Sequence, residues 1–148
     1  MQSVNLTNYS LVNDYTGVPV TKAAINSPNV NAIYAHLETL ANLAAIAYNV
    51  DTRAVLSICA FESSYGVGVT STNDIMQTGQ SYLTALGGLL GGCAVFADKL
   101  SSYGGNYPVA LSYYNCGVAT STGNSTCTFS SADVLGSIQI GRDQTEAG

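Results

Sequence analysis

Residues 51–63 are Asp51-Thr52-Arg53-Ala54-Val55-Leu56-Ser57-Ile58-Cys59-Ala60-Phe61-Glu62-Ser63, and this stretch decides the fold class. Asp51 is a good helix cap, and behind it apolar residues recur at helical spacing on the face that carries Val55, Ile58 and Cys59. Glu62 falls on the same face, near the end of the predicted helix. The sequence therefore predicts an apolar helix that carries one carboxylate on its hydrophobic side.

Further helices are predicted on both sides of this stretch. Upstream, apolar residues at three- and four-residue steps predict a helix from about Val30 to Tyr48, with His36 on its exposed side. Downstream, helical patterns cover about 80–90, 92–103, 107–115 and 132–140. Glycine pairs at 87–88 and 91–92 indicate either a break or a close packing contact. We therefore expect a mostly α protein with one domain at 29–148, behind an irregular lead-in at 1–28.

Composition and charge exclude two classes of partner. Only 9% of the 148 residues are charged, the net charge is −5, and the four basic residues are scattered. Nucleic-acid binding needs a clustered positive surface, so it is not expected. No window approaches the roughly 20 apolar residues that span a bilayer, and the first residues lack the pattern of a secretory signal. A surface of Ser, Thr, Asn, Gly and Tyr favours an extracellular, periplasmic or virion-associated protein.

The cysteine count permits two disulfides. Four cysteines allow three pairings: Cys59, Cys93, Cys116 and Cys127. The polar segment 117–126 makes Cys116 and Cys127 the natural local pair, which leaves Cys59 to join Cys93; buried free thiols are the alternative. A metal site is not expected, because no CxxC or histidine spacing is present and the single histidine lies far away in sequence.

Glu62 is the residue most suited to chemistry. A carboxylate on the hydrophobic side of a helix loses solvation, which favours its neutral form and raises its pKa. A general acid that works near neutral pH needs this property. The alternative is a glutamate at a helix end whose side chain tilts into solvent.

Three segments around Glu62 resemble motifs of the soluble lytic transglycosylase and goose-type lysozyme family, in the same order. Residues 50–63 are similar to the helix that ends in Glu-Ser, and Asp74-Ile75-Met76-Gln77 resembles Gly-Leu-Met-Gln. After a stretch at 92–106 that is similar to the family's next helix and turn, Tyr113-Tyr114-Asn115-Cys116-Gly117 resembles Ala-Tyr-Asn-Ala-Gly. The resemblance covers residues 50–117, just under half of the chain.

The resemblance implies a lysozyme-like α-fold with a substrate groove. It also implies cleavage of the β-1,4 bond between N-acetylmuramic acid and N-acetylglucosamine in peptidoglycan glycan strands, without a metal or cofactor. Glu62 would protonate the glycosidic oxygen and then act as a base on the muramoyl 6-hydroxyl. Six residues would bind the substrate or hold the Glu62 carboxyl: Ser63, Met76, Gln77, Tyr113, Tyr114 and Asn115. For each of these, packing or helix capping is the alternative.

The chain departs from the family beside the predicted catalytic residue. Asn73-Asp74-Ile75 replaces the usual glycine step, so Asp74 is placed to act as a second carboxylate that activates water in an inverting hydrolase. An ordinary loop or cap residue is the alternative for Asp74. The family's further groove tyrosine and Glu-Thr step are not found in residues 118–148.

Two other classes of function were weighed against a glycan-cleaving enzyme. A catalytically weak glycan-binding or virion structural protein of the same fold is compatible with the altered loop. A cysteine-dependent enzyme is not expected, because a cysteine nucleophile needs a histidine base and His36 falls on a different predicted helix.

Overall fold

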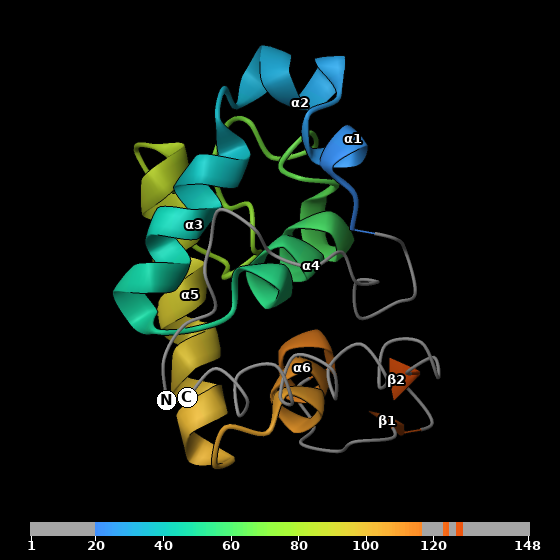
Figure 1. The fold of residues 1–148 in the computed structure, drawn as a ribbon, viewed down its shortest axis with the longest axis vertical. Coiled ribbons are helices and arrows are strands. Elements are labelled where there is room, and N and C mark those ends of the chain that lie inside the picture. Colours follow the sequence, from blue (N-terminus) through green and yellow to red (C-terminus); the bar gives the residue numbers. More distant parts are fainter. Residues whose placement is uncertain (1–19, 117–122, 125–126, 129–148) are drawn as a thin grey trace.

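Six helices and one short hairpin form the part of the chain that the computed structural model describes, residues 20–116, 123–124 and 127–128. The helices are α1 (Lys22–Ile25), α2 (Pro28–Ile33), α3 (Leu37–Tyr48), α4 (Thr52–Ser63), α5 (Ala85–Ser102) and α6 (Tyr107–Cys116), as Figure 1 shows. The strands β1 (Gly123–Asn124) and β2 (Cys127–Thr128) pair antiparallel. The prediction of a mostly α protein is confirmed, and the helices form a single compact domain.

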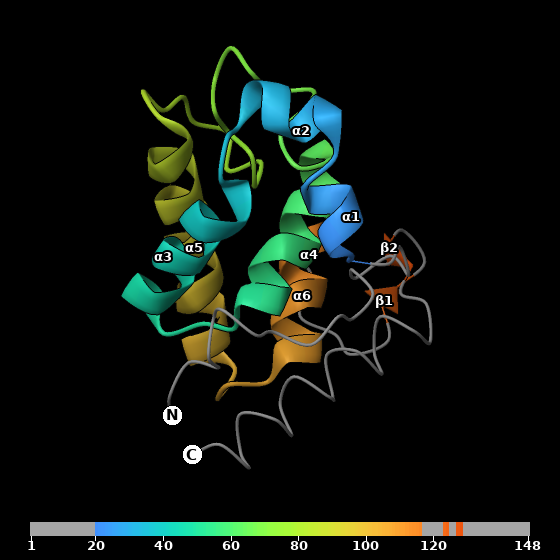
Figure 2. The ribbon, with the colours of Figure 1, turned by 45° about the horizontal axis from the view of Figure 1, so that its top comes forward.

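Helix α4 lies at the centre of the core. Asp51 caps it as predicted, because its carboxylate accepts the backbone N–H of Arg53 at 2.8 Å. Every residue from Thr52 to Cys59 is buried. Helix α3 packs against α4 and α5, and α5 packs against α6. Figures 1 and 2 show α4 beside the α3–α5 pair, with α6 near its N-terminal end. Burial of each large apolar side chain contributes roughly 1.5–3 kcal/mol.

The single helix predicted from about Val30 to Tyr48 is wrong, because the structure breaks it into α2 and α3. The break falls at residues 34–36, where His36 adopts a left-handed φ of 61° and is exposed. Tyr34 is buried there, and its hydroxyl lies 3.2 Å from Oδ1 of Asn73. Its ring fills the space beside Gly66, where a Cβ would lie 2.4 Å from a ring carbon. The tertiary contacts of Tyr34 thus break a helix that the spacing of apolar residues predicts to be continuous.

The two helices predicted at 80–90 and 92–103 are one continuous helix, α5, which begins at Ala85. Of the two interpretations of the glycine pairs, close packing is therefore the correct one. A Cβ on Gly88 would lie 1.8 Å from the Asn73 carbonyl oxygen, and one on Gly92 would lie 2.3 Å from Sδ of Met76. Glycine destabilises the interior of a helix. In α5 it also leaves room for residues 73–76 to lie against the helix.

The lead-in predicted as irregular contains one short helix. Thr21 caps α1 by accepting the N–H of Ala24 at 3.0 Å, and four residues are too few to show a hydrophobic period. Residues 1–19 and the helix predicted at 132–140 lie outside the described residues.

The predicted disulfide between Cys59 and Cys93 is wrong. Both are free thiols with no exposed surface, one on α4 and one on α5, and they fill the core as small apolar side chains. Burial raises the pKa of Cys93 to about 12, so its thiol stays protonated in the fold. The predicted Cys116–Cys127 pair lies outside the described side chains.

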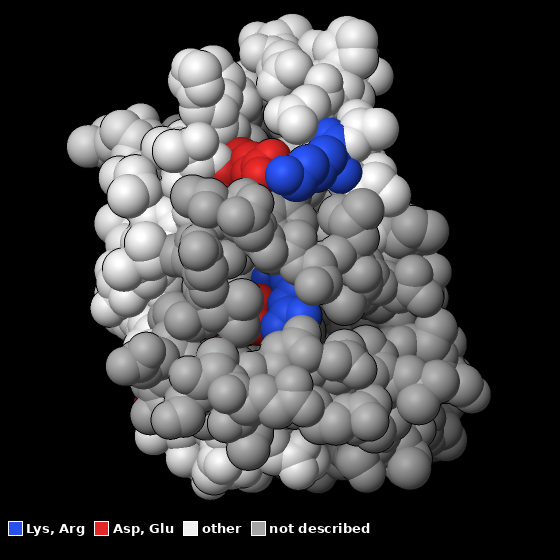
Figure 3. All heavy atoms as spheres, viewed as in Figure 1, with Lys and Arg blue, Asp and Glu red and all other residues white. Residues whose placement is uncertain are grey.

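Charge is sparse on the described surface. Figure 3 shows one face, on which the coloured side chains form two small groups. In one described ion pair, Lys22 and Glu38 lie 3.9 Å apart at the surface. In another, the Nε of Arg53 donates to Asp51 at 2.9 Å, and both side chains are buried. None of the described helices combines the length and the hydropathy needed to cross a membrane.

Candidate active site

Glu62 is the last residue but one of α4, and it is half-buried. The backbone turns sharply directly after this helix, since Ser64 and Tyr65 both adopt left-handed φ values, of 50° and 61°. Asn73 and Gln77 are left-handed as well. Non-glycine residues rarely take this conformation, and such strain is concentrated at functional sites. We call residues 64–79, which contain these four positions, the site loop.

Ser63, for which the resemblance implies support of the Glu62 carboxyl, holds the site loop. It is buried, and its hydroxyl donates to the Ile75 carbonyl at 2.6 Å. The same oxygen accepts the N–H of Gly66 at 2.9 Å. Ser63 therefore ties the end of α4 to both the beginning and the middle of the loop.

Tyr114 reaches the same loop from α6. Its phenol donates to the Met76 carbonyl, one residue beyond the carbonyl that Ser63 holds. Burial raises the pKa of this phenol, and the Glu62 and Asp74 carboxylates raise it further. Ser63, the residue after Glu62, and Tyr114 thus hold adjacent carbonyls of the site loop. Tyr114 stays protonated there and serves as a donor.

Asp74 closes the site loop on itself. Its side chain is 5% exposed, and its Oδ1 accepts the N–H and the hydroxyl of Thr78 at 2.8 and 3.0 Å. Its Oδ2 accepts the N–H of Gly79 at 2.9 Å. Both oxygens are thus engaged within the loop, which agrees with the alternative of an ordinary loop residue.

The two residues after Ile75 differ in their exposure. Met76 has no exposed surface and packs on Gly92, so the prediction that its side chain lines a groove is wrong; it is a core residue. Gln77 is exposed, with a left-handed φ of 56°, and its amide donates to the Asp74 carbonyl at 2.8 Å. Gln77 therefore keeps a solvent-facing surface although its amide helps to hold the loop.

The two neighbouring tyrosines of α6 have different surroundings. The Lys99 ammonium lies 4.4 Å from the centre of the Tyr113 ring, and the Tyr103 ring centre is 6.2 Å away. Tyr113 thus packs on the end of α5, whereas Tyr114 reaches the site loop. The Asn115 side chain lies outside the described part of the chain.

No protein-family model, curated protein or solved structure matches this chain. The kinship to lytic transglycosylases therefore stays a prediction that rests on the motifs in residues 50–117.

Sequence reasoning missed three residues that shape the site loop. Thr78 supplies two of the donors to Asp74, and the Thr78-Gly79 pair four and five residues after an aspartate was a local signal for this turn. Tyr82 lies 2.6 Å from the Thr78 hydroxyl, and Tyr34 reaches Asn73 from 39 residues away. No local pattern could have indicated those two tyrosines.

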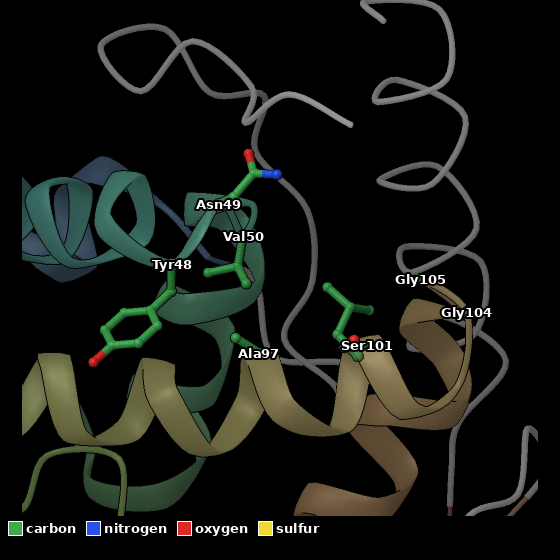
Figure 4. A pocket seen from close by; sticks show the side chains of 8 residues that line it. Tyr48, Asn49, Val50, Ala97, Ser101, Gly104 and Gly105 are labelled. Carbon is green, nitrogen blue, oxygen red and sulfur yellow. The ribbon is translucent and has the colours of Figure 1, made fainter.

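Two of the pockets on the described part of the chain include none of the predicted site residues. One, of about 360 Å³, lies between the ends of α3 and α5, with Val50, Ala97 and Leu100 among its lining residues (Figure 4). The other, of about 510 Å³, is polar and includes His36 and Glu38. Among the described residues, no three His, Cys, Asp or Glu side chains are grouped so that they could hold a metal ion.

Proposed function

We propose that the protein is a lytic transglycosylase that cleaves the N-acetylmuramic acid–N-acetylglucosamine bond of peptidoglycan, with Glu62 as its single general acid and base. The observation that carries the proposal is the half-buried Glu62 at the end of a buried helix, directly before the loop to which Ser63 and Tyr114 donate their hydroxyl hydrogens. The motifs in residues 50–117 supply the substrate class.

The proposed reaction needs only one carboxyl group. Protonated Glu62 donates its proton to the glycosidic oxygen as the bond to the muramoyl C1 breaks. The substrate's own N-acetyl group stabilises the resulting cation, as in glycosidases that lack a second carboxylate. The Glu62 carboxylate then takes the proton of the muramoyl 6-hydroxyl while that oxygen bonds to C1. Glu62 returns to its protonated state and no water is consumed.

The contacts of Asp74 favour this route over hydrolysis. A base that activates water must present a free lone pair to that water. The Asp74 carboxylate already accepts three hydrogen bonds from Thr78 and Gly79, and these bonds close the site loop. These bonds occupy three of the roughly four lone pairs of the carboxylate, so only about one is left for a water.

A glycan-binding protein without turnover is the second candidate, and one observation favours it. The hydroxyl hydrogens of Ser63 and Tyr114 are both donated to loop carbonyls, so these groups could only accept hydrogen bonds from a sugar. In either case the partner is the glycan strand, and we propose an extracellular, periplasmic or virion-associated location.

Two assays with purified peptidoglycan separate the candidates. We expect the wild type to clear a turbid suspension of peptidoglycan and Glu62→Gln to leave it turbid. Both proteins should sediment with the insoluble wall. Glu38→Gln is the matched control, since Glu38 is another helical glutamate whose ion pair with Lys22 lies at the surface. Sedimentation without clearing by the wild type would support the binding protein, and equal clearing by Glu62→Gln would contradict the role of Glu62.

A further inference from the structure

Three glycines on one side of α5 form a seat for the segment 73–82. Gly88, Gly91 and Gly92 are spaced by three and one residues, so they share one helix face. A Cβ on Gly88 would meet the Asn73 carbonyl at 1.8 Å, and one on Gly92 would meet Met76. A Cβ on Gly91 would lie 2.3–2.6 Å from three atoms of the Tyr82 phenol. The Tyr82 ring therefore packs directly on the α5 backbone, at a glycine that has no side chain to keep it away.

The hydrogen bonds that lead from Tyr82 have a fixed direction. The Thr78 hydroxyl lies 3.0 Å from Oδ1 of Asp74 and 2.6 Å from the Tyr82 hydroxyl. A carboxylate only accepts, and a hydroxyl has one hydrogen to give. Thr78 thus donates to Asp74, and Tyr82 must donate to Thr78. The result is a chain from Tyr82 through Thr78 to the carboxylate that closes the site loop.

The backbone of Tyr82 is held by two further hydrogen bonds. The Tyr82 N–H donates to the Thr72 carbonyl at 2.8 Å, and the Asn73 amide donates to the Tyr82 carbonyl at 3.0 Å. Tyr82 therefore anchors both sides of the turn that holds Asp74.

We propose that Tyr82 is a positioning residue of the Glu62 site, which acts through Thr78 and Asp74 and rests on the glycine seat of α5. The link to Glu62 runs through the two carbonyls that follow Asp74, because Ser63 holds the Ile75 carbonyl and Tyr114 holds that of Met76. Tyr82 makes no substrate contact in this proposal. The inference rests on the proposed function for its effect on catalysis, whereas the chain of hydrogen bonds stands on geometry.

The first test needs no substrate, so its result is independent of the proposed function. Amide hydrogen exchange is measured at Thr78 and Gly79, the two N–H groups that Asp74 accepts. Tyr82→Phe removes one hydrogen bond and speeds exchange at both positions about tenfold, the factor expected for a bond of ordinary strength. Tyr48→Phe, which removes a phenol on α3, leaves both rates unchanged. Unchanged rates in Tyr82→Phe would overturn the proposal.

The second test uses the rate of muropeptide release from peptidoglycan. Tyr82→Phe and Thr78→Val each lower kcat about tenfold with KM within about twofold, because they misplace the site and remove no substrate contact. The double variant is expected to be no slower than the slower single variant, since Tyr82 and Thr78 act through the same series of hydrogen bonds. Thr78→Ser keeps the hydroxyl, so we expect it to release muropeptides at the wild-type rate. If Tyr82→Phe fails to fold, the comparison of Thr78→Ser with Thr78→Val tests the hydrogen-bonded chain instead.

Each remaining outcome is decisive. Additive losses in the double variant, a change in KM alone, or failure of Thr78→Ser to restore the rate would overturn Tyr82 as a positioning residue. If the wild type releases no muropeptides while Tyr82→Phe speeds exchange as expected, the proposed function fails and its catalytic link to Tyr82 fails with it. The directed hydrogen bonds then remain as a structural finding.

Discussion

The two ends of α4 each place a carboxylate near a tyrosine of α6, with opposite results. At the N-terminal end, Asp51 and Arg53 have no exposed surface, and the Asp51 N–H donates to the Tyr107 hydroxyl at 3.0 Å. At the C-terminal end, Glu62 is half-buried and its charge acts on Tyr114. Both tyrosines pack on Phe96. One carboxylate is thus sealed inside the fold by a permanent cation, and the other keeps access to solvent.

This difference separates a structural charge from one suited to chemistry. A buried ion pair holds its shape only while both partners are present, and it is poorly placed to exchange protons. A half-buried acid that keeps contact with solvent can change its protonation state during a reaction.

Arg53→Met removes the cation at the N-terminal end and leaves the Asp51 carboxylate buried without its ion-pair partner. We expect a loss of about 3–5 kcal/mol in the free energy of unfolding, measured by urea denaturation. The double variant Asp51→Asn/Arg53→Met recovers part of that loss, because no buried charge remains. A single variant as stable as the wild type would show that this end of α4 does not depend on its ion pair.

Alkali tests the buried core on the α5 side, where Cys93 has no exposed surface. The pKa of Cys93 is raised to about 12 in the fold, from its ordinary value of 9.0, so above pH 9 the unfolded chain binds fewer protons than the native one. Stability from Cys93 is therefore complete below pH 9 and is lost as pH rises toward 12, at up to about 1.4 kcal/mol per pH unit. Urea midpoints of the wild type and Cys93→Ala, compared at pH 8 and pH 10.5, check this. A parallel decline in both proteins would contradict it.

Asp74→Asn tests the loop beside the C-terminal end. The variant keeps the shape of the side chain but replaces one acceptor oxygen by an NH2 group, so the Gly79 N–H or the Thr78 donors lose their partner. We expect destabilisation of about 1–3 kcal/mol by urea denaturation, the range for a buried donor left unsatisfied. Thr70→Ala, at an exposed position in the same loop, is the control. No change in Asp74→Asn would mean that Asp74 does not hold the loop.

Glu62→Gln is expected to have the smallest effect on stability, within about 0.5 kcal/mol, since its side chain keeps solvent contact. Thermal unfolding of this variant and of the wild type measures the difference. A loss comparable to that of Arg53→Met would make Glu62 a structural charge and remove the contrast between the two ends.

Local patterns in the sequence predict α4 and its surroundings well, because helix periodicity and an Asp51 cap are properties of neighbouring residues. The break at Tyr34 and the continuity of α5 were not predictable in this way. Both depend on contacts between Tyr34 or the α5 glycines and the site loop, which are distant in sequence.

The same limit applies to the candidate site. Glu62 could be singled out because its place on an apolar helix is local. The roles of Ser63 and Tyr114 could not, because their hydroxyls donate to carbonyls 12 and 38 residues away. Motif resemblance assigned both to the substrate or the catalytic carboxyl, whereas the structure gives their hydrogens to the loop.

The most direct test of the central claim is mass spectrometry of the muropeptides that the wild type and Glu62→Gln release from purified peptidoglycan. We predict that the wild type releases fragments lighter by one water than hydrolysis products, which marks 1,6-anhydro ends, and that folded Glu62→Gln releases none. Reducing ends of full mass would contradict the single-carboxyl mechanism, and release by Glu62→Gln at the wild-type rate would contradict Glu62 as the catalytic acid.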